Sequence, residues 1–257
     1  MDDFLGPLTS LIPVVALVSV RIGVAVAMLP APFGSVAPTP VRAALTVMLA
    51  ITLALPMYDG TPVDLGTFAL GRAAVGELLV GAAIGLTVRV TLAAAEIAGT
   101  FAGFSMGLGF AGSVDPMFGE MSLPSTRLIG SLGALIFFVV GGHHVVIGAL
   151  GASLDAAPVG DAFSAIAHAG IVEIGSDMLS NGLRIAAPVV ATMFIVQIGT
   201  GLISRAAPRV QIFSLSFAVA AAAGSLTLLV AAPSIATAIG VEINRLPDRI
   251  LEALGGP

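Results

Sequence analysis

The sequence predicts an all-α integral membrane protein, and its composition carries the prediction. Hydrophobic residues make up 57% of the 257 residues and charged residues only 10%, whereas a soluble domain carries about 25% charged residues. So few polar groups cannot cover the surface of a water-soluble globule. The abundance of apolar residues also excludes a disordered chain, which is poor in them.

The positions of the charges predict six or seven hydrophobic helices. Several uncharged runs reach the roughly 20 residues that a helix needs to cross a hydrocarbon core of about 30 Å. Prolines and short polar segments separate these runs. The expected helices are 4–28, 41–56, two within 70–110, 127–150, 183–203, and a last run from 210 to 241 that Pro233 kinks or divides.

Three segments depart from the apolar pattern. Residues 106–122 are rich in Gly, Met and Phe, and residues 151–182 form a polar, acidic insertion. Inside the insertion, apolar residues from Phe163 to Ile174 recur at helical spacing and predict a short amphipathic helix. Residues 242–257 predict an amphipathic C-terminal tail.

The composition also excludes several kinds of catalytic and binding site. The sequence has no cysteine, which excludes disulfides, thiol catalysis and cysteine-based metal sites. It has no lysine, so the P-loop motif for nucleotides cannot occur. A net charge of -5 without a basic run argues against nucleic acid. We therefore expect no cofactor, no metal and no nucleic acid partner.

A row of glycines predicts close helix packing. Gly99, Gly103 and Gly107 stand four residues apart and so share one face of a predicted helix. Without side chains on that face, another helix can approach backbone to backbone. The face serves either general packing or a dedicated subunit interface.

Four ionisable side chains fall inside the predicted helices. They are Glu77, Glu96, His143 and His144. Ionisable groups at membrane depth are costly and often mark ion or proton paths. A plainer interpretation pairs the glutamates with Arg72 or Arg89 and assigns the histidines to backbone groups at a helix kink.

The segment 106–122 is the most unusual stretch. Its glycines free the backbone and a Pro breaks any helix, yet its bulky side chains are apolar. Irregular backbone at membrane depth requires surrounding protein or a water-filled cavity. Flexible Met and Phe side chains can seal a passage and still part for cargo; otherwise the segment is a re-entrant packing loop. The candidate gating residues are Met106, Phe110, Met117, Phe118 and Met121.

Three stretches carry a family resemblance: FSMGLGFAGSVDP (104–116), LIFFVVGGHHVVIGAL (135–150) and LISRAAPRVQIFSLSF (202–217). With their spacing, they resemble the FliR family of the type III secretion export apparatus over nearly the whole chain, as one domain, 1–257. The VDP and GGHH pieces are more similar to the flagellar branch than to the injectisome branch. Arg209 and Gln211 depart from the family pattern.

The resemblance implies a non-enzymatic export-gate subunit in the bacterial inner membrane, at the flagellar basal body. It implies a pseudo-symmetric assembly of helical hairpins with FliP and FliQ, associated with FlhB and membrane lipid. Unfolded flagellar subunits pass through the centre of that assembly. In the family, the loop equivalent to 106–122 plugs the closed pore, and much of the assembly stands above the bilayer plane.

The resulting function is a core subunit that forms and closes a protein-conducting channel for flagellar export. The alternative is a proton-coupled small-molecule permease that uses the intramembrane Glu and His residues and works alone in liposomes. An intramembrane protease is a minor third possibility, because residues 103–107 match the nucleophile signature G-x-S-x-G around Ser105.

Overall fold

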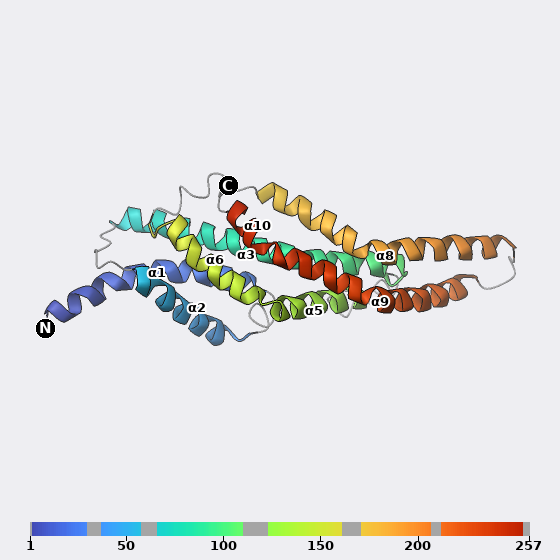
Figure 1. Cartoon of the computed structure of the whole chain (residues 1–257), viewed down its shortest axis with the longest axis horizontal. Helices are drawn as coiled ribbons and strands as arrows, with labels where there is room; N and C mark the ends of the chain where they lie inside the picture. Colours follow the sequence, from blue (N-terminus) through green and yellow to red (C-terminus); the bar gives the residue numbers. More distant parts are fainter. Residues whose placement is uncertain are drawn as a thin grey trace. The chain divides into compact units, whose positions relative to one another are not determined.

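The regular elements of the computed structural model are all helices in the residues that it describes, 2–29, 37–57, 66–109, 123–160, 171–206 and 212–253. The predicted all-α class is confirmed. Figure 1 shows α1 (Asp2–Met28), α2 (Thr39–Ala54), α3 (Thr67–Ser105), α5 (Pro124–Val139), α6 (Gly142–Ala156), α8 (Ile171–Ala206), α9 (Ile212–Asn244) and α10 (Leu246–Ala253), and a short 3-10 helix, η1 (Leu55–Met57), follows α2.

Fewer helices than expected can cross a membrane. Within the described ranges, four are long and apolar enough, in α1, α3, α8 and α9, or five if α5 and α6 count as one broken span. The expected number of hydrophobic helices agrees with the described residues, in which α1, α2, α3, α5, α6, α8 and α9 are apolar. Two features lower the number that can cross a membrane. Residues 70–110 hold one long helix rather than two, and α2, with 16 residues, extends only about 24 Å.

Helix α3 is continuous for 39 residues. Its apolar run contains Glu77, Arg89 and Glu96, which suggested a division, but no proline interrupts its backbone hydrogen bonds. At about 1.5 Å per residue the helix is about 58 Å long, nearly twice the thickness of a hydrocarbon core. Charges inside an apolar run therefore do not mark a helix boundary here.

The single helix expected at 127–150 is broken where α5 ends and α6 begins. Gly141 precedes α6 with a φ of 80°, a left-handed conformation that costs side-chain-bearing residues about 1–2 kcal/mol. Pro233, expected to kink or divide the last run, lies inside α9, which continues to Asn244. The break thus falls at a glycine that adopts positive φ.

The chain forms two compact units. Unit 1 comprises Met1–Val90, Gly141–Ile174 and Arg245–Pro257, and unit 2 comprises Thr91–Val140 and Gly175–Asn244. In unit 1, α1 packs against α2 as an antiparallel hairpin, and α10 packs against α6 (Figure 1). In unit 2, α5 packs against α9, and α8 and α9 run in opposite directions (Figure 1). Helix α3 contributes to both units.

Of the two predicted amphipathic helices, the structure describes the one in the C-terminal tail but not most of the one near Phe163. Helix α10 lies within the tail 242–257 and buries Leu246, Ile250 and Ala253. Most of the short helix expected around Phe163 falls in 161–170, outside the described residues. Helix α8 begins at Ile171 and includes the end of the polar insertion.

Candidate functional site

Helix α3 ends in a glycine turn directly before the unusual segment. The N–H of Gly107 donates to the carbonyl of Phe104, and the N–H of Leu108 donates to the carbonyl of Gly103, both at 3.0 Å. This pair of bonds is a Schellman motif, which occupies carbonyls left unpaired at a helix end. Gly107 has a φ of 77°, so it terminates the helix instead of sharing the packing face of Gly99 and Gly103.

The other two glycines of the row lie against the start of α5. A Cβ on Gly99 would come within 2.6 Å of the Cα of Thr126 and 2.7 Å of the carbonyl oxygen of Ser125. A Cβ on Gly103 would come within 2.7 Å of a methyl carbon of Leu123. Without side chains at these two positions, α3 and α5 approach backbone to backbone.

We expect Gly99→Ala to destabilise the protein by about 1–3 kcal/mol, the usual cost of overpacking. Gly199 in α8 is the matched control, because a Cβ there meets no heavy atom within 4 Å. Alanine should be neutral or stabilising at that position, since it favours helix over glycine by about 1 kcal/mol. Thermal unfolding of the two detergent-purified variants measures the difference. Equal midpoints would contradict the close packing of α3 on α5.

Met106, the first candidate gating residue, directly follows α3 and packs against α9. Its side chain is 3% exposed. A Cβ on Gly224 of α9 would lie 2.7 Å from the Cε of Met106 and 2.9 Å from its Sδ, so the missing side chain of Gly224 makes room for the thioether. The other four candidates lie outside the described residues. They are Phe110, Met117, Phe118 and Met121.

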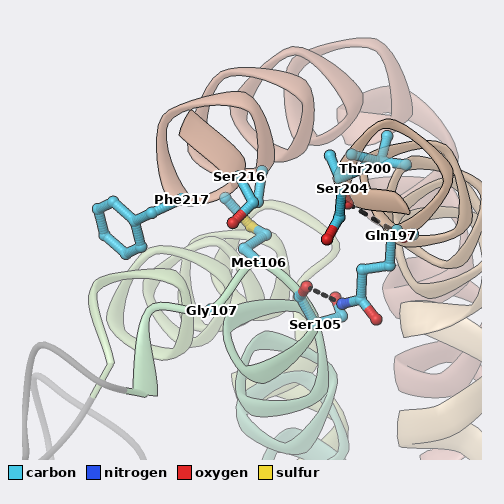
Figure 2. A pocket seen from close by; sticks show the side chains of 11 residues that line it. Ser105, Met106, Gly107, Gln197, Thr200, Ser204, Ser216 and Phe217 are labelled. Atoms are coloured by element: carbon cyan, nitrogen blue, oxygen red, sulfur yellow. Dashed lines mark hydrogen bonds between the residues drawn. The ribbon is translucent and has the colours of Figure 1, made fainter. Parts of the chain in front are cut away.

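A cavity of about 390 Å³ adjoins the end of α3, within unit 2 (Figure 2). Its apolar lining includes Met106 and Phe217, and the side chains that line it carry no charge. The side-chain amide of Gln197 donates from Nε2 to the carbonyl of Ser105 at 2.9 Å (Figure 2), which satisfies another carbonyl at the helix end. The polar lining residues are Ser105, Gln197, Thr200, Ser204 and Ser216.

The polar face of α8 was missed in the sequence, although a signal for it was present. Gln197, Thr200 and Ser204 recur every three to four residues in an otherwise apolar run. This spacing places them on one face of a helix. Polar periodicity in an apolar helix, like apolar periodicity in a polar one, indicates a face with a distinct environment.

Ser105 lacks the setting of a hydrolase nucleophile. That motif requires a sharp strand-to-helix turn that exposes the serine, whereas Ser105 is the last residue of α3. Its hydroxyl donates to the carbonyl of Ala102 at 2.7 Å, a bond within the same helix. The G-x-S-x-G match is here the sequence of a helix end.

A buried ion pair joins α1, α3 and α6 in unit 1. Arg21 and Glu77 are both 0% exposed, and the Nε of Arg21 donates to Oε2 of Glu77 at 2.6 Å. Nη1 donates to the carbonyl of Ser153 and Nη2 to the carbonyl of Ala157, both at 2.8 Å. Both carbonyls lie at the end of α6, where the helix dipole attracts a cation. The carbonyl of Ser153 also accepts the N–H of Ala157 at 2.9 Å.

The partner of Glu77 differs from the sequence-based interpretation, which named Arg72 or Arg89. Arg21 lies 56 residues away in the chain, so spacing along one helix could not reveal it. A signal did exist, because Arg21 is the only charged residue in the stretch 4–41. An isolated arginine in a long apolar run usually faces a polar partner inside the protein.

The remaining ionisable candidates are distributed over both units. Glu96 of α3 lies beside α5, where a Cβ on Gly130 would come 3.1 Å from its Cγ. His143 and His144 lie in the first turn of α6 with ring centroids 4.0 Å apart. The histidines belong to unit 1 with Glu77, and Glu96 belongs to unit 2. In the described part of the chain, no three His, Asp or Glu residues cluster in a way that could hold a metal.

Comparison with known proteins gives a consistent result over most of the chain. The model of the family described as bacterial export proteins, family 1, matches residues 12–246. The chain is 30% identical over 209 residues to the flagellar biosynthetic protein FliR of Escherichia coli K12, covering 80% of each chain. It is also 30% identical over 208 residues to FliR of Caulobacter vibrioides, covering 78% of this chain and 80% of the relative.

A relative with a different name is also similar. The chain is 26% identical over 189 residues to the Yop proteins translocation protein T of Yersinia pestis, covering 71% of this chain and 72% of the relative. Relatives named for flagellar biosynthesis and for protein translocation therefore share this sequence pattern.

Proposed function

We propose, because this chain belongs to the family of bacterial export proteins, family 1, that it is a non-catalytic core subunit of a flagellar protein export gate. In this role it forms and closes the channel through which unfolded flagellar subunits leave the cell. Its proposed cellular location is the bacterial inner membrane, at the flagellar basal body. The expected partners are FliP, FliQ and FlhB, together with membrane lipid.

The apolar surfaces of α8 and α9 support a role within an assembly. In each of their apolar segments only 22% of the residues are buried within the chain, against 61% for α3. Large side chains such as Ile195, Leu229 and Val230 are 70%, 72% and 74% exposed. Such surfaces require lipid or other apolar helices around them.

Helix length favours neighbouring subunits over lipid for part of this surface. Helices α8 and α9 contain 36 and 33 residues, so each is about 50 Å long or more, well beyond a hydrocarbon core of about 30 Å. An apolar surface that extends past the bilayer needs protein to cover it. The sequence also has no Trp and one Tyr, so it lacks the aromatic belt that anchors helices at both membrane interfaces.

The segment 106–122 is the proposed plug of the closed channel. Its N-terminal end is held firmly by the Schellman turn at Gly107, the burial of Met106 and the bond from Gln197. A plug needs such an anchor, because a sealing element must return to the same place after cargo has passed. In this proposal, Phe110, Met117, Phe118 and Met121 supply the deformable seal.

The proposed function can be tested by measuring how much flagellar protein the source bacterium exports with and without this chain. Deleting the gene should stop the appearance of flagellar subunits in the medium, and expression of the intact chain should restore it. The permease alternative predicts instead that the purified chain alone moves small molecules into liposomes. Normal flagellar export without the gene would contradict the proposal.

A further inference from the structure

The cavity beside the end of α3 has a lining suited to one class of ligand. Its polar groups are a carboxamide and hydroxyls, which can both donate and accept hydrogen bonds. The lining offers no charged side chain that could pair with an ionic ligand. Main-chain N–H and C=O groups are neutral and always require partners, so they match this lining.

The dimensions of the polar face also suit a peptide. From Gln197 to Ser204 the helix rises by seven steps of about 1.5 Å, or about 10 Å. An extended chain rises about 3.3 Å per residue, so about three residues fit along this face. The Thr200 hydroxyl donates to the carbonyl of Gln197 at 3.0 Å, which leaves its oxygen to accept a hydrogen bond from a ligand.

The apolar wall completes the match. Met106 and Phe217 belong to the cavity lining. In Figure 2, Met106 lies across from the polar side chains of α8, whereas the ring of Phe217 points away from them. Neither side chain carries a charge or a strong hydrogen-bonding group that would select particular side chains of a ligand. Recognition would then depend on the main chain and little on the sequence of the ligand.

We propose that this cavity binds about three residues of an extended polypeptide through its main chain, with Gln197, Thr200 and Ser204 as hydrogen-bonding partners. The inference rests on the proposed export function and names the part of the chain that a polypeptide in transit contacts. Because the cavity lies within unit 2, the site needs no residue from unit 1.

Photo-crosslinking in the intact export complex tests the site. A photoreactive side chain replaces Thr200 in one variant and Leu229 in another, and an export substrate is stalled by a folded fusion domain. Leu229 is the matched control, because it is 72% exposed on α9 and does not line the cavity. The expected result is a substrate adduct at position 200 and little or none at position 229.

Other adducts overturn the inference. Adducts at position 200 with lipid or a neighbouring subunit only, in a variant that still exports, would show that the cavity has another occupant. The proposed export function would survive that result. Normal flagellar export after deletion of the gene would instead refute the proposed function itself.

Removal of the hydroxyls provides a second readout. With the photoreactive side chain at Val196, which also lines the cavity, Thr200→Val combined with Ser204→Ala should lower the yield of crosslinked substrate roughly fivefold or more, as expected for two lost hydrogen bonds. Thr192→Val is the control, because Thr192 lies on the same helix and makes the same kind of bond, to the carbonyl of Pro188 at 2.9 Å. An equal yield in the double variant and the control would contradict main-chain recognition at this face.

Discussion

Arg21→Leu is expected to destabilise the protein by about 3–5 kcal/mol, the cost of removing one partner from a buried ion pair. Glu77 would be left at 0% exposure without its cation. The carbonyl of Ala157 would lose the donor that Arg21 supplies, and the carbonyl of Ser153 would keep only the N–H of Ala157. Thermal unfolding of the detergent-purified chain and its level in membranes measure the loss.

Arg72→Leu is the matched control for Arg21→Leu. Arg72 lies in α3, five residues before Glu77, and its side chain is exposed. Surface arginines usually contribute 1 kcal/mol or less. A similar small effect for both variants would mean that the Arg21–Glu77 pair does not hold α1, α3 and α6 together.

A double substitution separates the charge from the helix-end bonds. Replacing both partners by apolar residues removes the uncompensated carboxylate, so Arg21→Met with Glu77→Met should be more stable than Arg21→Met alone. The rescue should be incomplete, because methionine cannot donate to the carbonyls at the end of α6. Full recovery would show that those carbonyls need no donor.

Deletion of residues 110–119 is expected to make the cell membrane permeable to ions while export partly survives. This deletion removes most of the proposed seal but leaves the described end of α3 and its Schellman turn intact. Without bulky side chains across it, a channel wide enough for a polypeptide would pass hydrated ions. Membrane conductance, or uptake of a small dye, measures the leak.

An equally long deletion at 161–170 is the control for a general defect in membrane insertion. That stretch lies in the polar insertion between α6 and α8, away from the proposed plug in the sequence. Both deleted chains must first be found in the assembled complex. Background conductance in the assembled 110–119 variant, equal to that of the control, would remove the plug assignment.

The helical class and the approximate positions of the helices could be predicted from the sequence, because hydropathy and proline placement act locally. Helix boundaries that depend on tertiary contacts could not be predicted from the sequence. The charges in α3 suggested two helices, yet Glu77 is neutralised by Arg21 and stays inside one continuous helix. The turn at Gly141, by contrast, required a positive φ that sequence spacing does not reveal.

The candidate site was only partly visible in the sequence, for a similar reason. Gly99 and Gly103 were assigned a packing face, and both lie in close contact with the start of α5 or the residue before it. Gly107, in the same row, has a different role because the helix ends two residues earlier. The Arg21–Glu77 pair and the Gln197–Ser105 bond join residues 56 and 92 positions apart, distances over which a single sequence carries no pairing signal.

Native mass spectrometry of the complex extracted from the source membrane shows whether this chain is a subunit of a larger export assembly. We expect the chain to emerge in one particle with several other helical membrane proteins, which peptide sequencing identifies as export-apparatus components. A lone copy carrying only bound lipid, and able by itself to transport small solutes in liposomes, would contradict this expectation.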